Sequence, residues 1–354
     1  TVSRLQYILT NALAVLGFGL LLVYFKYTIK QTLIIALVVC SVNVQLGPLI
    51  QQFWYNVFIN GFYASYGVPT ASETPYLMIR DTPTQNINSI TLGFVRISTY
   101  TSISLLVGLS SVIGKIGLFS TFIASILFNI GWNLSYYLNY MIYFQQTANS
   151  YTFQIMDDFQ GSRVFMFGAG FGLALLLIYN KYAPARVPAA QYSDTFSSLF
   201  TLLGTAFVIS LFYFVLDTYT QQSRLQSLLN IFFAFSGSIV SSIAISCILD
   251  GVITLHNVNM SVIAGALQIS IIGGFIKTPY VSILVGAFAG IVTALASSFI
   301  HSKLNHTKIR DSKGVFVIYF INCLLCSYFI CPIIIKAYKN VGILPDYNDG
   351  FHMV

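Results

Sequence analysis

Long apolar runs separated by short polar stretches form the dominant pattern of this sequence. A helix needs about 20 mainly apolar residues to cross the hydrocarbon core of a bilayer. The runs that meet this length predict ten membrane-spanning helices, at 6–26, 32–53, 91–113, 117–144, 163–180, 196–216, 226–249, 259–276, 279–300 and 315–336. No long polar stretch interrupts them, so we expect residues 1–354 to form a single transmembrane domain.

Two stretches between the predicted helices are longer than the rest, at 54–90 and 145–162. The first contains Glu73, the only glutamate of the chain, among several Asn, Thr and Pro residues. Connections of this length are uncommon in compact domains and are often functional. We expect the 54–90 loop to cover one membrane face or to contact a partner.

The composition agrees with this pattern. Hydrophobic residues make up 56% of the chain, charged residues only 8%, and the mean hydropathy is +0.77. Soluble domains carry about 25% charged residues. The fold class is therefore predicted to be an all-α polytopic membrane protein in a lipid bilayer. The net charge is +7, and the positive residues lie in short loops without forming a basic stripe. This distribution argues against nucleic-acid binding.

The positive charges also bear on the orientation in the membrane. With ten spans, the two sides carry nine and eight positive residues, so the totals decide little. The loop at 301–314 holds four of these charges and gives the strongest single indication. The positive-inside rule then predicts that this loop is cytoplasmic and that both termini lie on the opposite side.

Motifs for enzyme chemistry are missing from the sequence. It contains no P-loop, H-E-x-x-H, G-x-S-x-G or strand-linked nucleotide fingerprint, so we expect no enzyme and no cofactor. All five cysteines lie in apolar runs and are expected to be buried and reduced. Cys323 and Cys326 form a C-x-x-C without a second pair or a nearby histidine, which argues against a metal site. Gly286 and Gly290 form a G-x-x-x-G that predicts close helix packing, around a pore or as ordinary contact.

Several segments together resemble the Rhesus glycoprotein branch of the ammonium transporter (Amt/Rh) family, in the same order along the chain. DDFQGSRVFMFGAGFGLALLL resembles the family's Asp-x-x-Gly-Ser run followed by an FGAYFGL-like helix. The other segments that carry the resemblance are GFGLLLVYFKY at 17–27, TSISLLVGLSSVIGK at 101–115, SSLFTLLGTAFV at 197–208, SSIAISCIL at 241–249 and the string from 280 to 314.

The resemblance implies a fold of two inverted five-helix repeats, with one central pore in each subunit of a homotrimer. Inverted repeats place a transport pathway near the bilayer midplane, at the interface of the repeats. The family resemblance further implies a plasma-membrane location.

The resemblance also points to two positions in the pore. Members of the family carry a pair of hydrogen-bonded histidines there, and imidazole suits the task because it titrates near neutral pH. In this chain the two positions fall on Phe165 and Tyr319. The four histidines are expected in loops or the tail. Because phenylalanine neither hydrogen-bonds nor relays a proton, the departure indicates a degenerate ammonium pore.

Two charged residues fall at the expected outer mouth of this pore. Asp158 matches the family's vestibule aspartate and would attract a cation, or it caps the following helix near its positive dipole end. Arg163 stands where the family has an apolar residue and would repel a cation. We expect a local Asp158–Arg163 pair, which would assign these charges a structural role.

Two further residues are candidates for the vestibule or gate. Tyr100 occupies the position of the family's gating phenylalanine, and it either stacks over the mouth or is an interfacial tyrosine. The family carries an acidic residue in the helix expected at 117–144, where this chain has none. Asn133 is the nearest polar candidate.

Two functions from different classes follow. The first is a Rh-like scaffold with a degenerate pore, a structural or accessory subunit of a larger membrane complex, with the mitochondrial inner membrane as an alternative location. The lost histidines and the load of 30 Phe and 23 Tyr favour it. The second is a channel or transporter for ammonia, ammonium or another small neutral gas, and it rests on the resemblance alone.

Overall fold

The described part of the chain consists of helices and short connecting residues. The structure is a computed structural model that describes residues 12–13, 16–17, 20, 29–57, 92–112, 116–148, 162–182, 199–208, 221–249, 251, 255–273, 276–301 and 316–340. Its α-helices are α2 (Ile29–Asn56), α5 (Leu92–Ser110), α6 (Leu118–Ala148), α7 (Phe167–Tyr182), α9 (Gln221–Leu249), α10 (Leu255–Ile272), α11 (Pro279–Ala296), α13 (Asn322–Leu325) and α14 (Cys331–Asn340). Four π-helical segments adjoin them, namely η2 (Ser162–Met166), η4 (Ser297–His301), η5 (Phe316–Ile321) and η6 (Cys326–Ile330).

Four of the described helices are long and apolar enough to cross a membrane, over Leu33–Trp54, Leu118–Ser135, Gln226–Leu249 and Pro279–Phe299. Shorter apolar helices cover Val164–Tyr179, Leu199–Val208 and Ile318–Ile334. Each of these seven segments overlaps a predicted span. The first predicted span, 6–26, lies outside the described residues apart from a few positions, and so do most of the predicted loops at 54–90 and 145–162. Residues 54–56 and 145–148 of these predicted loops belong to α2 and α6.

Several helix ends differ from the predicted spans for a simple reason. α6 continues to Ala148 and α9 begins at Gln221, so both helices extend beyond their apolar runs through glutamine-containing turns. Glutamine is a good helix former, so a helix need not end where its hydrophobic run ends. α10 is shifted toward the N-terminus and ends at Ile272, directly before two glycines. α11 begins with Pro279 after an extended Thr278, a favoured helix start.

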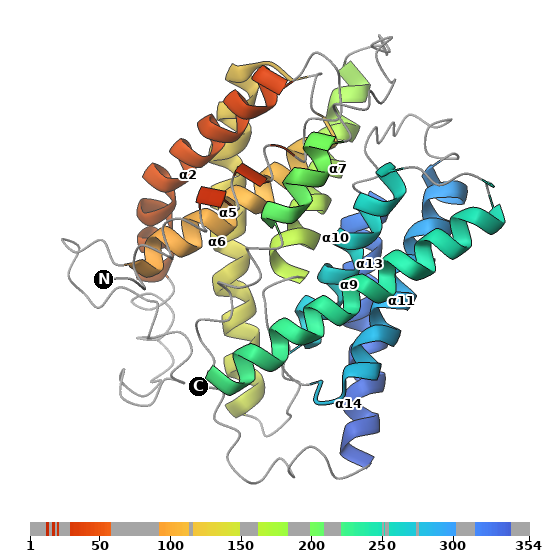
Figure 1. Cartoon of the computed structure of the whole chain (residues 1–354). Coiled ribbons are helices and arrows are strands. Elements are labelled where there is room, and N and C mark those ends of the chain that lie inside the picture. Colours follow the sequence, from red (N-terminus) through yellow and green to blue (C-terminus); the bar gives the residue numbers. More distant parts are fainter. Residues whose placement is uncertain are drawn as a thin grey trace. The chain divides into compact units, whose positions relative to one another are not determined.

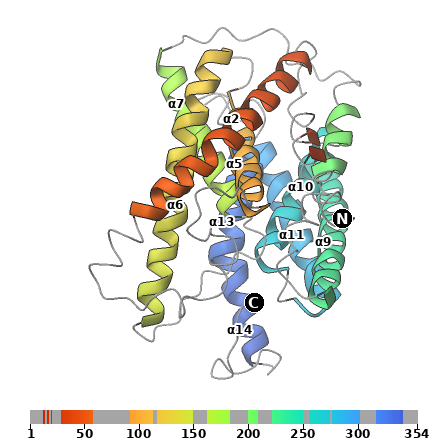
Figure 2. The same ribbon diagram turned by 90° about the vertical axis from the view of Figure 1, so that its left-hand side faces the viewer.

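The backbone groups into two compact units, each assembled from separate stretches of the chain. Unit 1 comprises Thr1–Ala36, Ile103–Ile116 and Asp157–Asp346, and unit 2 comprises Leu37–Ser102, Gly117–Met156 and Tyr347–Val354. In unit 1, α9, α10 and α11 pack side by side, as Figures 1 and 2 both show. α10 also contacts η2, η5 and α13, which places it at the centre of this group.

The predicted G-x-x-x-G forms a close crossing between α9 and α11. A Cβ at Gly286 would collide with the carbonyl of Ala234, and one at Gly290 would collide with the carbonyl of Ser238. The Ser241 hydroxyl donates to the Ala287 carbonyl at 2.8 Å across the same crossing. Small residues let the two backbones meet directly, which is the usual way that helices associate in a membrane.

Two helices are enclosed on every side over much of their length. Residues 98–112, in and after α5, and residues 261–270 of α10 are all buried. Many of these buried side chains carry hydroxyl or amide groups, including Ser104, Ser261 and Gln268. A helix that is buried all round belongs to the interior of its protein, whereas lipid-facing helices have an exposed apolar side.

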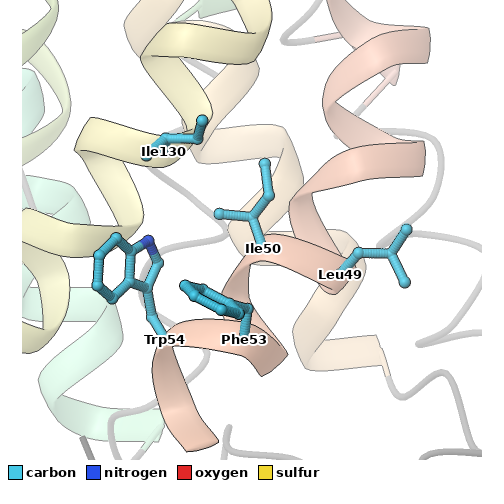
Figure 3. A pocket seen from close by; sticks show the side chains of 5 residues that line it. All are labelled: Leu49, Ile50, Phe53, Trp54 and Ile130. Carbon is cyan, nitrogen blue, oxygen red and sulfur yellow. The ribbon is translucent and has the colours of Figure 1, made fainter. Parts of the chain in front are cut away.

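Unit 2 contains most of α2, the first half of α5 and α6, and Figure 2 shows α2 crossing α6. Beside the crossing lies an apolar pocket of about 290 Å³, lined by Leu49, Ile50, Phe53 and Trp54 of α2 and by Ile130 of α6 (Figure 3). The Phe53 and Trp54 rings meet edge to face, with centroids 5.3 Å apart.

Candidate functional site

Phe165 and Tyr319 lie face to face in unit 1. Their rings are stacked, with centroids 5.9 Å apart and planes inclined by 9°. The two residues are 2% and 7% exposed. The structure therefore brings together the two positions that the family resemblance singled out, although they are far apart in the sequence.

Both aromatic residues occupy π-helical turns. Phe165 belongs to η2, which leads directly into α7, and Tyr319 belongs to η5, which leads into α13. π-helical turns are rare and occur often at functional sites, because the wider turn redirects a side chain. Phe165 and Tyr319 thus each lie in a π-helical turn that directly precedes an α-helix. Sequence reasoning did not detect these turns, since an apolar run reads the same in either helix type.

The second half of α5 fixes the position of η2. The Ser104 hydroxyl donates to the Val164 carbonyl at 2.5 Å, one residue before Phe165. A Cβ at Gly108 would lie 2.6 Å from the Gly168 carbonyl oxygen, so the two backbones meet without side chains between them. The Ser111 hydroxyl donates to the Gly172 carbonyl at 3.1 Å, one helical turn further along α7. The Phe165 ring is thus held by direct contact between two helix backbones.

A buried amide network fixes the position of η5. The Asn322 amide donates to the carbonyl of Ile318 at 3.1 Å and to the hydroxyl of Thr293 at 3.0 Å. Gln268 of α10 donates to Asn322 at 2.9 Å, and the Cys326 thiol donates to the Gln268 carbonyl at 3.0 Å. The network ties α10, α11 and α13 together next to Tyr319. Gln268 stands out in the sequence as a polar residue inside an apolar run, and this signal was missed.

The chemistry available to the stacked pair is limited. A phenyl ring offers no hydrogen bond, and the phenol of Tyr319 is one donor and acceptor with an ordinary pKa far above neutrality. Stacked aromatic rings gain about 0.5–1.5 kcal/mol beyond the burial of their area. The arrangement holds two apolar rings together and lacks the paired imidazoles that would bind an amine and handle its proton.

The remaining predicted site residues are distributed as follows. Tyr100 lies in the part of α5 that belongs to unit 2 and is buried. Asn133 lies on α6 in unit 2, buried, and donates to the Asn129 carbonyl at 2.9 Å. The backbone of Arg163 lies in η2, two residues before Phe165. Asp158 lies outside the described residues, so the Asp158–Arg163 pair stays a prediction.

Two expectations about histidine and cysteine need correction. His256 is the second residue of α10 and His301 ends η4, so these two histidines lie at helix ends and not in loops. The apolar runs end near them, but the helices include them. The five cysteines all lie within the described residues and form no disulfide, and Cys323, Cys326 and Cys331 are buried as expected. Cys247 is exposed, because it lies on an outward face of α9.

Comparison with known proteins gives a consistent result. Residues 5–342 match the model of the Ammonium Transporter Family. The chain is 24% identical to ammonium transporter Rh type C of Xenopus tropicalis over 166 residues, which covers 45% of this chain and 36% of that protein. It is 23% identical to ammonium transporter Rh type A of Bos taurus over 311 residues, covering 84% of this chain and 63% of that protein. Neither alignment reaches two thirds of the relative's length.

Solved structures show the same fold. Rh50 of Nitrosomonas europaea superposes with a TM-score of 0.72 at 17% identity, covering 96% of this chain and 82% of that one. Mep2 of Saccharomyces cerevisiae superposes with a TM-score of 0.62 at 14% identity, covering 91% and 72%.

These neighbours support the all-α polytopic membrane fold predicted from the sequence. Proteins of this kind are channels and transporters, not enzymes, and they are typically trimeric. With a family model that matches residues 5–342, the chain belongs to the Ammonium Transporter Family.

Proposed function

We propose that this chain is a Rh-like membrane protein whose ammonium pore is degenerate, and that it serves as a structural or accessory subunit of a larger membrane complex. The observation that carries the proposal is the stacked, buried contact between Phe165 and Tyr319. At the positions where the family resemblance expects two histidines, two aromatic rings lie against each other.

The physical argument concerns what a passing cation would meet. Ammonium that enters a buried, apolar constriction loses its water and needs hydrogen-bond acceptors in exchange. The Phe165 ring supplies none, and the Tyr319 phenol supplies one oxygen. Without an imidazole, the pair also has no group that exchanges a proton near neutral pH. Both properties favour a closed path at this point.

The outer surface suits a subunit surrounded by lipid or by other proteins. Several large apolar side chains of α6 are exposed, including Phe119 at 76%, Phe122 and Leu127. Aromatic residues are enriched where proteins meet each other. A homotrimer, as in the family, and a place among other subunits are both compatible with this surface. Such a subunit would lie in the plasma membrane or, alternatively, in the mitochondrial inner membrane.

A second candidate is a channel for ammonia or another small neutral gas. Family membership over residues 5–342 favours it. A neutral molecule avoids most of the desolvation penalty of a cation, so it needs fewer polar contacts on its path. In this case Phe165 and Tyr319 would have to part transiently to let the molecule pass.

Permeation separates the two functions. The purified full chain, a Phe165→His/Tyr319→His double variant and empty vesicles are compared by stopped flow, with an internal pH dye that follows an ammonium pulse. We expect the native chain to match empty vesicles. A gain in the double variant would show that the substituted pair closes an otherwise intact path. Permeation by the native chain above empty vesicles would contradict the degenerate pore and support the second candidate.

The accessory role is tested by isolating the protein from its native membrane. We expect a tagged chain, solubilised in mild detergent, to migrate in a complex larger than a homotrimer and to retain the same partner proteins after cross-linking. Recovery of a homotrimer alone, with no reproducible partner, would contradict the accessory role whatever the permeation assay gives. The Phe165→His/Tyr319→His variant, isolated in the same detergent, is the matched control, and the complex that it forms is compared with that of the native chain.

A further inference from the structure

A second buried polar feature lies in unit 2, on α6. Four polar residues recur at every fourth position and form what we call the α6 polar stripe: Thr121, Ser125, Asn129 and Asn133. All four are at most 1% exposed. Residues four apart share one face of a helix, so the stripe is a continuous polar line inside an apolar membrane span. The Phe165–Tyr319 pair belongs to unit 1, so the stripe is a separate feature.

Each residue of the stripe bonds to its own helix. The hydroxyls of Thr121 and Ser125 donate to the carbonyls four residues earlier, at 3.1 and 2.8 Å. The amides of Asn129 and Asn133 do the same, at 3.2 and 2.9 Å. These bonds satisfy the hydroxyl donors, which is common for Ser and Thr in membrane helices. They leave the two amide oxygens, Asn129 Oδ1 and Asn133 Oδ1, without a hydrogen bond among the described residues.

The stripe meets a third amide from α2. Asn129 Nδ2 donates to Asn43 Oδ1 at 2.5 Å, and both residues are 0% exposed. We call Asn43 and Asn129 the amide pair. Asn43 Nδ2, like Asn129 Oδ1, has no hydrogen-bond partner within the described chain. Exchanging the nitrogen and oxygen of one amide alone would place two donors or two acceptors against each other. Any hydrogen-bonded arrangement of the pair therefore leaves one amide nitrogen and one amide oxygen without a partner in the pair.

Gly47, one turn after Asn43, leaves the backbone bare next to these groups. A Cβ at this position would lie 2.8 Å from Ser98 Oγ and 3.7 Å from Asn129 Oδ1. The hydroxyl of Ser98 and the free oxygen of the amide pair therefore converge on the same side of α2. Three helices contribute to this point: α2, the first half of α5 and α6.

A comparable asparagine in unit 1 shows what a fully bonded amide looks like. Asn230 Nδ2 donates to the carbonyls of Gly273 and Ile276 at 2.9 and 2.7 Å. Its Oδ1 accepts from the Ser282 hydroxyl at 2.9 Å. Buried polar groups are nearly always paired in this way, and an unpaired one costs about 1–3 kcal/mol. The unpaired Asn43 Nδ2 and Asn129 Oδ1 belong to two side chains that are hydrogen-bonded to each other, and Asn133 lies one turn further along α6. These atoms therefore point to a bound molecule that pairs with them.

We propose that the amide pair, with Ser98 and the bare backbone of Gly47, binds one small neutral molecule that both donates and accepts hydrogen bonds, of the chemical class of water and ammonia. Asn43 Nδ2 requires an acceptor, whereas Asn129 Oδ1 and Asn133 Oδ1 require donors. A bare cation fails the first requirement and an anion fails the second. Polar buried sites with several such partners are the ones that hold ordered water.

Water-edited solid-state NMR on the full chain in liposomes tests this site, with asparagine side-chain amides labelled with ¹⁵N. The Asn43 amide is assigned from the signal lost in an Asn43→Ser variant, and that of Asn230 from an Asn230→Ser variant. We expect the Asn43 amide to take up magnetisation from water at short mixing times, while Asn230 does not. An Asn43 shift that appears only with added ammonia at alkaline pH would identify ammonia as the occupant. An Asn43 amide as dry as Asn230, with no response to ammonia, would overturn the proposal.

Two variants check the location. Gly47→Ala places a methyl group against Ser98 and Asn129 and is expected to abolish the transfer of magnetisation to Asn43. Alanine also favours helix over glycine, so the fold should be retained. Ser125→Ala is the matched control on the same stripe, since its hydroxyl bonds only to its own helix, and it should leave the transfer unchanged. Full transfer in folded Gly47→Ala protein would contradict a site beside Gly47.

Discussion

Single buried side chains hold this protein together at points where apolar packing alone would leave the helices free to slide. Asn230 of α9 bonds to the carbonyls of Gly273 and Ile276, which follow the end of α10, and to Ser282 on α11. One residue therefore links α9 to α11 and to the segment after α10. Asn322 has the same role beside Tyr319. Such amides are satisfied only when all their neighbours are in place. They therefore select one helix arrangement from the many that an apolar surface would allow.

Replacing Asn230 by Ala should strongly destabilise unit 1. The change leaves the Gly273 carbonyl and the Ser282 hydroxyl without their Asn230 partner, and each unpaired buried group costs about 1–3 kcal/mol. The Ile276 carbonyl loses one of its two bonds and keeps the one from Gln226. Thermal unfolding in detergent, followed by circular dichroism, should show a lowered Tm. Ser236→Ala on the same helix is the control, because that hydroxyl is exposed and bonds to its own helix. Equal Tm values for the two variants would refute the linking role of Asn230.

The sequence allowed some of these residues to be identified but not their contacts. Phe165 and Tyr319 were found as a pair through family motifs, and the structure brings their rings together. Ser104, Gln268 and Asn43 were missed. A polar residue inside an apolar run indicates an inward-facing position, yet the residue that it meets comes from another helix. Nothing in local spacing specifies that partner, so such contacts emerge only from the tertiary arrangement.

At the level of helices, glycine determines how closely two backbones approach. The crossing of α9 with α11 and that of α5 with α7 both use glycine against a backbone carbonyl. The first was predicted from its G-x-x-x-G spacing. For the second, the glycines of α7 indicated a close approach by another helix, but nothing in the sequence showed that Gly108 of α5 would meet them. The π-helical turns at Phe165 and Tyr319 were also not predicted. Their wider turns depend on packing against neighbours and leave no mark on hydrophobic periodicity.

A methyl group at Gly286 should separate α9 from α11. The added Cβ of Gly286→Ala would meet the Ala234 carbonyl, which belongs to rigid helix backbone and cannot move aside as a flexible side chain would. Overpacking of this kind costs about 1–3 kcal/mol and sometimes more. We expect a reduced yield of monodisperse protein in size-exclusion chromatography. Gly117→Ala, where a Cβ meets nothing within 4 Å, should behave like the native chain. A normal yield for Gly286→Ala would show that the crossing is looser than described.

For the whole molecule, the hydrophobic pattern predicted the membrane class and the order of the described helices. The family model over residues 5–342 and the Rh50 superposition confirm the fold class. The division into two compact units built from interleaved stretches was not predicted. It depends on which helices pack together, and hydropathy reports only which segments leave water. The single-domain interpretation and the orientation in the membrane stay predictions.

The orientation is tested by labelling introduced cysteines. Lys308→Cys and Gln222→Cys are made in a Cys247→Ser background, because Cys247 is the exposed native cysteine. The charge pattern places residue 308 in the cytoplasm and residue 222 outside. In intact cells or right-side-out vesicles, an impermeant maleimide should label the variant at 222 at once and the variant at 308 only after permeabilisation. The reverse pattern would invert the topology. The Cys247→Ser parent reports the background from the three buried cysteines and from Cys40.

The enclosed helix α10 has a consequence for how the chain is made. Its buried stretch at 261–270 includes Ser261, Gln268 and Ser270, so lipid is a poor solvent for it until neighbouring helices arrive. Gln268 bonds to Asn322, which is synthesised later. A ribosome that has just completed α10 therefore presents a helix that has α9 and η2 as neighbours but still lacks α11, η5 and α13. We infer that α10 waits at the translocation channel or beside an insertase, and that a nascent chain arrested before α13 is a target for membrane quality control.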